Sequence, residues 1–189
     1  MSQIISLPSM LMIGGSGRNI GKTTLICAII SKLASSVPII GLKVTSIRPG
    51  EADSHGNHQS PLSENYKITE ESGIEECKDT ARMLIAGAKR VYFIQSTDSQ
   101  LPMAMESFFE LEDRNSIIIC ETRSLRRLIK PGLFILINDP SCDNPKSDFN
   151  NYIEFADLLL QFDQKNRTMK TNADKIRLEN GEWSLDYLK

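Results

Sequence analysis

The residues best suited to chemistry lie in the segment MIGGSGRNIGKTTL, Met12 to Leu25. A bound phosphate needs several backbone N–H groups that converge on it, an approach free of Cβ atoms, and the positive end of a helix behind it. A glycine-rich turn between a strand and a helix supplies all three, and a neighbouring lysine adds a mobile charge. We therefore predict a site for the phosphate groups of a nucleotide in this segment.

The spacing differs by one residue from the common phosphate-loop pattern G-x-x-x-x-G-K-[ST]. Counting back from Gly21 places Ser16 where the first glycine belongs, and Gly15 lies one position earlier. Gly17 lies inside the loop, and the pair Gly14-Gly15 lets the backbone turn sharply off the strand. With these glycines, a loop that is one residue longer can still surround a phosphate group. A glycine-rich turn that binds no ligand stays the alternative.

We expect the nucleotide-binding residues of this segment to form one continuous run. They are Gly15, Ser16, Gly17, Arg18, Asn19, Ile20, Gly21, Lys22, Thr23 and Thr24. The ammonium of Lys22 would balance charge on the transferred phosphoryl group, and the hydroxyl of Thr23 would bind a Mg²⁺ ion that bridges the phosphates. The run thus predicts a nucleoside triphosphate, GTP or ATP, bound with Mg²⁺.

The elements that position this loop follow from apolar periodicity. Five continuous apolar runs predict strands, at 10–13, 37–44, 91–94, 117–120 and 133–137. Helical spacing predicts helices at 25–33, 79–88 and 98–111, a helical turn at 125–129, and a helix-strand pair at 149–162. Continuous rather than alternating apolar strands are typical of a parallel sheet covered on both faces. We therefore expect a three-layer α/β fold, a mostly parallel sheet with helices on both faces.

Two segments depart from this alternation. The stretch 46–76 lacks clear periodicity, and we expect a long loop or insertion there, since loops of this length are usually functional or disordered. In 172–189, Asn180-Gly181 separates two alternating segments, which is the strongest short-range signal for a β-hairpin. No internal repeat or linker divides the chain, so we expect a single domain spanning 1–189.

Composition restricts the class of protein. The 189 residues, of which 40% are hydrophobic, are enough for one sizeable core. A net charge of -2 argues against a general nucleic-acid binder. The four cysteines are scattered without metal-binding spacing, which suits a reducing cytoplasm. No segment resembles a signal peptide or a membrane span, so we expect a cytoplasmic protein without a nucleic-acid or membrane partner.

Polar residues follow three other predicted strands at their carboxyl ends, where open α/β sheets bind ligands. Lys43 is a candidate for stabilising charge during phosphoryl transfer, together with Lys22. Glu121 suits Mg²⁺, directly or through water, and the amide of Asn138 suits the edge of a purine base. The alternatives are a solvated lysine, a surface glutamate and an Asn-Asp-Pro turn.

Three further groups of polar residues have both a structural and a functional interpretation. Asp79 opens a predicted helix, where a carboxylate complements the macrodipole. Asp53, His55 and His58 are either solvated or a lid or metal-binding cluster in the long segment. The basic cluster of Arg123, Arg126, Arg127 and Lys130 forms either a solvated face or a site for a phosphorylated second substrate.

The loop GSGRNIGKTT, Gly15 to Thr24, resembles that of dethiobiotin synthetases and other members of the SIMIBI class of P-loop NTPases, in which the additional residue is normal. The segment IIICETRS, Ile117 to Ser124, is similar to a strand of these proteins that ends in a glutamate. In dethiobiotin synthetase, the aspartate that opens the helix after the second strand binds magnesium. The resemblance therefore implies that Asp79 binds the metal beside Thr23 and Glu121.

Two segments also look like the MobB family, the molybdopterin-guanine dinucleotide biosynthesis protein B. GLKVTS ends the second strand with a lysine, and CKDTARMLIAGAKRVYF resembles the family's K-D-[ST]-x-R run that leads through a helix to A-G-A and a strand. The similar segments cover about half of the chain. Two details differ, because MobB usually has K-H-x-H-H after the lysine and Gly-Phe after the glutamate, where this chain has KVTS and Thr122-Arg123.

The resemblance implies a P-loop NTPase that binds and hydrolyses GTP or ATP with Mg²⁺, in molybdopterin cofactor biosynthesis. It also implies a small phosphorylated or pterin substrate, a partner enzyme and a homodimer. Two other functions stay open. One is an ATP-dependent ligase or kinase of the dethiobiotin synthetase type, and the other is a non-catalytic adaptor that binds nucleotide to dock a partner.

Overall fold

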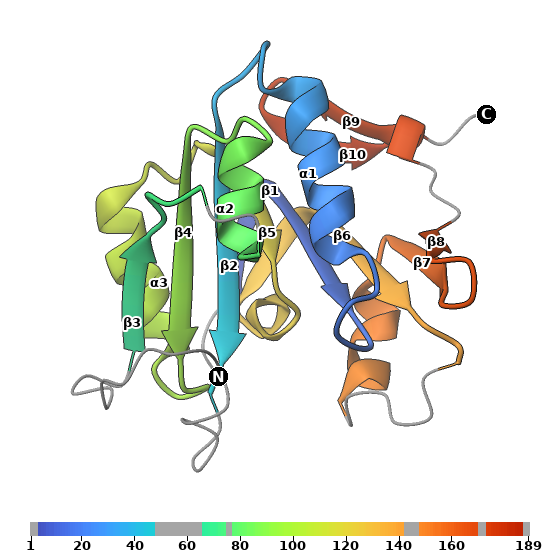
Figure 1. The fold of residues 1–189 in the computed structure, drawn as a ribbon. Helices are drawn as coiled ribbons and strands as arrows, with labels where there is room; N and C mark the ends of the chain where they lie inside the picture. The colour runs from blue at the N-terminus through green and yellow to red at the C-terminus, as the bar shows by residue number, and fades with distance from the viewer. Residues whose placement is uncertain (1–3, 48–65, 75–76, 142–147, 170–172, 187–189) are drawn as a thin grey trace.

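The computed structural model describes residues 4–47, 66–74, 77–141, 148–169 and 173–186, and it confirms the α/β fold (Figure 1). Eight strands form one sheet in the order β3-β4-β2-β5-β1-β6-β7-β8. Their bounds are β1 Ile5–Gly15, β2 Ile39–Ser46, β3 Tyr66–Glu70, β4 Arg90–Ser96, β5 Ile117–Glu121, β6 Ile129–Asn138, β7 Leu158–Asp163 and β8 Thr168–Met169. The pairs between β4 and β7 in this order are parallel, and the edge strands β3 and β8 are antiparallel to their neighbours.

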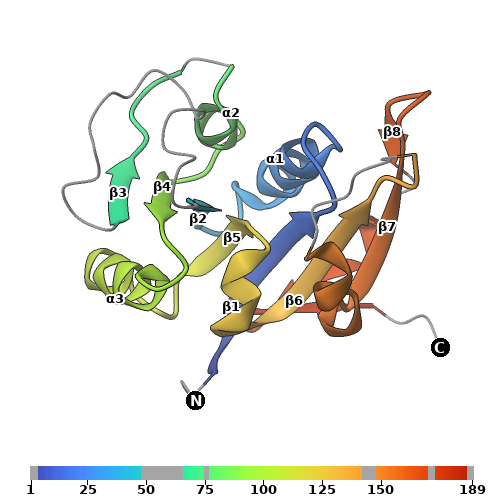
Figure 2. The same cartoon turned by 90° about the horizontal axis from the view of Figure 1, so that it is seen from below.

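Helices cover both faces of the sheet, as expected (Figure 2). One face carries α1 Lys22–Leu33 and α2 Asp79–Ile85, and the other carries α3 Leu101–Leu111 and the 3₁₀ helices η1 Ser124–Arg127 and η2 Phe149–Phe155. Within the described residues, no helix is long and apolar enough to cross a membrane.

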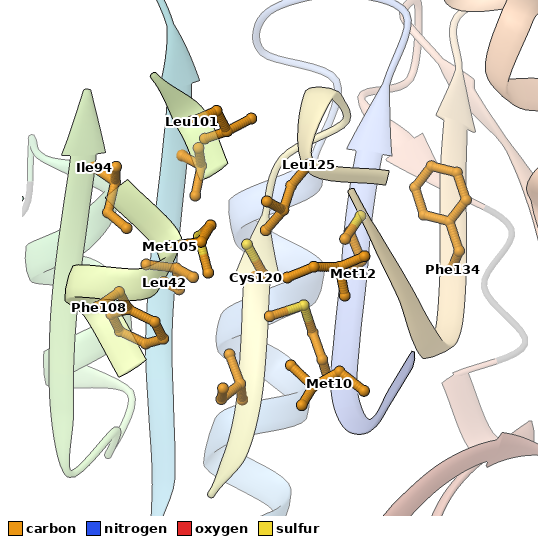
Figure 3. Packing of buried hydrophobic residues seen from close by; sticks show 14 of the residues in the cluster. Met10, Met12, Leu42, Ile94, Leu101, Met105, Phe108, Cys120, Leu125 and Phe134 are labelled. Atoms are coloured by element: carbon orange, nitrogen blue, oxygen red, sulfur yellow. The ribbon is translucent and has the colours of Figure 1, made fainter. Parts of the chain in front are cut away.

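The continuous apolar strands are explained by burial on both faces. Leu11 and Ile13 of β1 pack in the core under α1, whereas Met10 and Met12 pack in the core under α3 (Figure 3). All four are fully buried. Because successive side chains of a strand point to opposite faces, a strand between two helical layers needs apolar residues at every position.

The described part of 46–76 contains a strand, β3, where the sequence predicts only a long loop. β3 pairs antiparallel with β4 at the edge of the sheet. Its apolar residues Tyr66 and Ile68 pack against the core under α3, and the alternate residues Lys67 and Thr69 face the opposite side. The candidates Asp53, His55 and His58 lie outside the described residues.

The predicted hairpin is present and is formed by β9 Ile176–Glu179 and β10 Glu182–Leu185. Asn180 and Gly181 have φ angles of 52° and 81°, and a two-residue type I′ turn requires positive φ at both positions. The hairpin packs on the sheet through Trp183, whose indole N–H donates a 3.0 Å hydrogen bond to the carbonyl oxygen of Ser9. This bond fixes the hairpin to the first half of β1.

A buried polar cluster joins the end of α3 to the start of β4. The carboxylate of Glu112 is 4% exposed and accepts hydrogen bonds from Tyr92 Oη at 2.8 Å and from a terminal nitrogen of Arg90 at 3.0 Å. The Nε of Arg90 lies 2.9 Å from Oε1 of Glu112, the same oxygen that accepts the hydrogen bond from Tyr92. Burial, followed by the hydrogen bond and charge of Glu112, raises the pKa of Tyr92 to about 12.

This shift predicts a loss of stability at alkaline pH. A tyrosine in an unfolded chain titrates near pH 10, so the contribution of Tyr92 to stability is complete below about pH 10 and is lost as the pH rises to about 12. We expect the free energy of unfolding of the wild type to fall in this window by on the order of 2 kcal/mol more than that of Tyr92→Phe. Denaturant unfolding at several pH values measures both, and parallel curves would contradict the assignment.

Candidate functional site

A large cleft, about 1540 Å³ in volume, opens at the carboxyl ends of the parallel strands. The loop between β1 and α1 lines one part of it, and the ends of β2 and β5 and the start of α2 line the adjoining part. The predicted phosphate loop therefore lies where an open α/β sheet binds its ligands.

The glycines of the loop occupy positions that other residues would disturb. A Cβ atom on Gly15 would lie 2.5 Å from Cδ1 of Ile20 and 3.0 Å from the carbonyl oxygen of Ile137. Gly21 has a φ of 81° directly before α1, in the left-handed region that favours glycine. The loop thus turns tightly from strand to helix, with the side chain of Ile20 buried beneath it.

Ser16 faces away from the cleft, although it belongs to the predicted run. Its N–H donates to the carbonyl oxygen of Ile137 at 2.9 Å, and its Oγ accepts the N–H of Asp139 at 3.0 Å. The residue is fully buried. Both groups hold the loop against the end of β6, so the amides that remain for a ligand come later in the loop.

The later residues of the run line the cleft, among them Gly17, Arg18, Asn19 and Thr24. The ammonium of Lys22 donates a 2.7 Å hydrogen bond to the carbonyl oxygen of Gly17. The lysine side chain therefore reaches back along its own loop, to the place where a bound phosphate would need a positive charge.

Three oxygen-bearing side chains from separate elements meet at the start of α1. The Oγ1 atom of Thr23 lies 2.7 Å from Oε2 of Glu121 and 3.0 Å from Oδ1 of Asp79. Thr23 lies in the first turn of α1, Asp79 begins α2, and Glu121 ends β5. A hydroxyl has a single proton and donates to one carboxylate at a time. Two carboxylates thus converge on one proton, and these oxygens are the ligand type that Mg²⁺ prefers.

This group contains two carboxylates and no third. Within the described residues, no group of three or more His, Cys, Asp or Glu side chains is arranged so that it could hold a metal ion by itself. Mg²⁺ bound to a nucleotide uses one or two carboxylates and takes its other ligands from phosphates and water. The pair Asp79 and Glu121, with Thr23, therefore fits a nucleotide-bound Mg²⁺ better than an ion held by protein alone.

Lys43 is positioned beside the same group by the sheet register. It lies directly opposite Glu121 on the neighbouring strand, and its ammonium forms an ion pair with Oδ2 of Asp79. Burial would raise the pKa of Asp79, but the hydrogen bond and charge of Lys43, followed by the contributions of Thr23 and Arg82, outweigh burial and lower it. Asp79 is therefore a carboxylate at neutral pH.

Two arginines of the basic cluster, Arg123 and Arg127, lie on the other side of the cleft, and Arg123 contacts the loop. Arg123 donates a 3.3 Å hydrogen bond to the carbonyl oxygen of Gly15 and forms an ion pair with Asp148. Arg127 lies 3.4 Å from the same carboxylate and 3.7 Å from that of Asp98. The acidic partners match the charge of both arginines. For Arg123 and Arg127, these contacts support a structural role more than contact with a phosphorylated second substrate.

Asn138 ends β6 and pairs with Gln161 of β7, and it is not among the described residues that line the cleft. That side of the cleft is lined by Phe162, Arg167 and Met169 instead. A Cβ atom on Gly21 would lie 3.3 Å from the ring of Phe162. The sequence singles out none of these three as a binding residue: Phe162 belongs to the apolar pattern of the last predicted strand, and the turn with Arg167 and the two-residue strand β8 are too short for a periodic signal.

Comparison with known proteins leaves the family open: no protein-family model, no curated protein and no solved structure matches the chain. The resemblance to MobB and dethiobiotin synthetases therefore stays a prediction from local motifs. The geometry of the cleft is the basis for the function that we propose.

Proposed function

We propose that the chain binds the triphosphate of GTP or ATP together with Mg²⁺ and turns it over slowly. The observation that carries this proposal is the convergence of Thr23, Asp79 and Glu121 directly behind a glycine loop that opens a helix. Backbone N–H groups at a helix N-terminus attract phosphate, and the adjacent oxygens supply the ligands of its metal. The resemblance to SIMIBI proteins supports the same function.

In this proposal each residue of the site has a separate role. Thr23, Asp79 and Glu121 would hold Mg²⁺, which supplies positive charge next to the phosphates when it is bound. Lys22 would exchange the carbonyl oxygen of Gly17 for a phosphate oxygen. Lys43, one strand from Glu121, would stabilise negative charge that develops on the terminal phosphate.

We propose slow turnover because neither carboxylate near the phosphates is available as a general base. A general base must accept a proton from the attacking water. Asp79 is ion-paired with Lys43, the single proton of Thr23 is available to either Asp79 or Glu121, and both carboxylates would hold Mg²⁺. We therefore propose a low intrinsic rate that a partner enzyme or a second substrate raises.

The size of the cleft favours a second candidate function. Small-molecule sites usually have volumes of about 300–1,000 Å³, and this cleft of about 1540 Å³ has room for a ligand beside the nucleotide. A kinase or ligase of the dethiobiotin synthetase type would use that room for an acceptor. A MobB-like protein in molybdopterin cofactor biosynthesis, acting in the cytoplasm as a homodimer, would use it for a phosphorylated or pterin ligand.

Isothermal titration with ATP and with GTP, each with and without Mg²⁺, tests the proposal. We expect saturable binding that is tighter with Mg²⁺, followed by slow phosphate release in a turnover assay. Tighter binding of GTP favours the MobB-like function, and binding without turnover favours the adaptor. An absence of heat with either nucleotide at millimolar Mg²⁺ would contradict the proposal.

A further inference from the structure

Among the residues that the structure describes, helices cover only part of the sheet face that carries α1 and α2. α2 packs over β2 and β4 near Gly41, where an added Cβ would lie 3.4 Å from Sδ of Met83 and 3.0 Å from Val91. Toward the carboxyl ends of β2 and β4, Figure 1 shows these strands and β3 extending past α2. The residues of this open part line the same cleft as the phosphate loop.

Strand register places six cleft-lining side chains together on this open part. One row across the sheet is Lys43, Phe93 and Thr69, and the next is Thr45, Gln95 and Lys67. We call this group the polar platform. The alternate residues of the same strands, such as Leu42, Tyr92 and Ile94, lie in the core under α3. The alternation leaves the platform residues on the cleft side.

The platform has the composition of a ligand site. Phe93 is half-buried in a wall that otherwise presents ammonium, hydroxyl and amide groups. Lys67 is exposed and forms no ion pair with any residue of the described ranges. An aromatic ring offers a flat apolar contact, and an ammonium attracts an anionic group. Their combination selects a flat molecule with a negative charge.

The position of the platform links it to the proposed nucleotide site. Lys43 is part of its first row, is ion-paired with Asp79 and lies opposite Glu121. A ligand on the platform would therefore lie next to the metal-binding oxygens and the terminal phosphate. The two arginines on the other side of the cleft already have carboxylate partners in Asp98 and Asp148.

We infer that the polar platform binds a second small ligand, a ring-bearing anion such as an aryl phosphate or aryl carboxylate. Phe93 contacts the ring, Lys67 pairs with the anionic group, and Gln95 hydrogen-bonds a polar edge of the ligand. The inference rests on the proposed function only in calling this ligand the acceptor beside the nucleotide. Binding to the platform can be measured without any nucleotide.

Phenyl phosphate is a suitable probe, with ligand-observed NMR titration as the readout. We expect saturable binding to the wild type, weaker binding of methyl phosphate, and an affinity for phenyl phosphate that falls about tenfold in Lys67→Met, because the substitution removes the ammonium that pairs with the anionic group. Phe93→Leu should weaken phenyl phosphate and leave methyl phosphate unchanged. Lys32→Met is the matched control, since Lys32 is exposed and lies outside the residues that line the cleft.

Comparing Lys67→Met with Lys22→Met separates this inference from the proposed function. Lys22→Met, in the phosphate loop, should leave binding of phenyl phosphate intact, whereas Lys67→Met should leave binding of ATP and GTP intact. If Lys22→Met lost binding of phenyl phosphate and Lys67→Met kept it, the probe would bind at the phosphate loop. That result would overturn the inference. Failure of the wild type to bind the probe at millimolar concentration would overturn it as well, whatever the nucleotide titrations show.

Discussion

Replacing Lys22 by methionine is expected to lower the affinity for ATP or GTP about a hundredfold. Methionine keeps most of the length of the side chain and removes the ammonium that now donates to the carbonyl oxygen of Gly17. A charge-assisted hydrogen bond contributes about 1.5–3 kcal/mol, and the upper part of that range corresponds to about a hundredfold in affinity. Isothermal titration with Mg²⁺ present measures the loss.

The matched control for this prediction is Lys32→Met. Lys32 lies on the same helix, in its last turn, and is exposed. The substitution Lys32→Met removes the same charge from the protein at a position outside the cleft. We expect its nucleotide affinity to equal that of the wild type. If Lys22→Met also bound nucleotide like the wild type, the phosphate loop would not be the binding site.

Glu121→Gln is expected to remove most of the effect of Mg²⁺ on nucleotide binding. Glutamine has the same shape and still accepts a hydrogen bond from Thr23, but it takes one negative charge away from the oxygens that would hold the metal. We expect the gain in affinity on adding Mg²⁺ to shrink about ten- to a hundredfold, with little change in affinity without metal. Titrations at several Mg²⁺ concentrations measure this gain.

Thermal stability separates a loss of metal binding from a loss of fold. Glu121 is 7% exposed, and a buried carboxylate has a cost of desolvation that the neutral amide lacks. Glu121→Gln should therefore melt at or above the temperature of the wild type. Glu106→Gln, an exposed position on α3, is the control for the charge alone. An undiminished Mg²⁺ effect in Glu121→Gln would exclude Glu121 as a metal ligand.

Much of the fold could be predicted because its central strands are buried on both faces. The run 10–13 lies in β1 and the run 117–120 in β5, and each alternates between the two cores. The hairpin could be predicted because Asn180-Gly181 carries the information for the turn locally. The sequence also selects Thr23, Asp79 and Glu121, and the structure brings them within hydrogen-bonding distance. Their binding of metal stays a prediction.

The remaining features depend on contacts between distant segments. β3 is short and half polar, because Lys67 and Thr69 face the cleft and only Tyr66 and Ile68 face a core. Such a strand at the edge of a sheet has no continuous apolar run to reveal it. The polar platform likewise exists only through the register of three strands.

The orientation of Ser16 in the loop also depends on a distant segment and could not be predicted from the motif. Its place in the motif predicts contact with phosphate, but its groups bond to Ile137 and Asp139 at the end of β6. Asn138 ends the same strand, as predicted, yet the described lining of the cleft does not include it. Which way a residue at a strand end faces depends on the neighbouring strand, and a single segment does not carry that information.

The central position of β1 has a consequence for how the protein acquires its activity. Met10 pairs with Ile118 and Met12 with Phe134, so the ladders on both sides of β1 close stretches of roughly a hundred residues. Contacts that are so distant in sequence form slowly, because the entropy of closing the chain is lost before they contribute stability. The loop that leaves β1 is held at its start by bonds from Ser16 to Ile137 and Asp139, so we expect it to take its shape only after β1 has paired with β6. During refolding, affinity for nucleotide should therefore return only in the slowest kinetic phase, after helical signals have recovered.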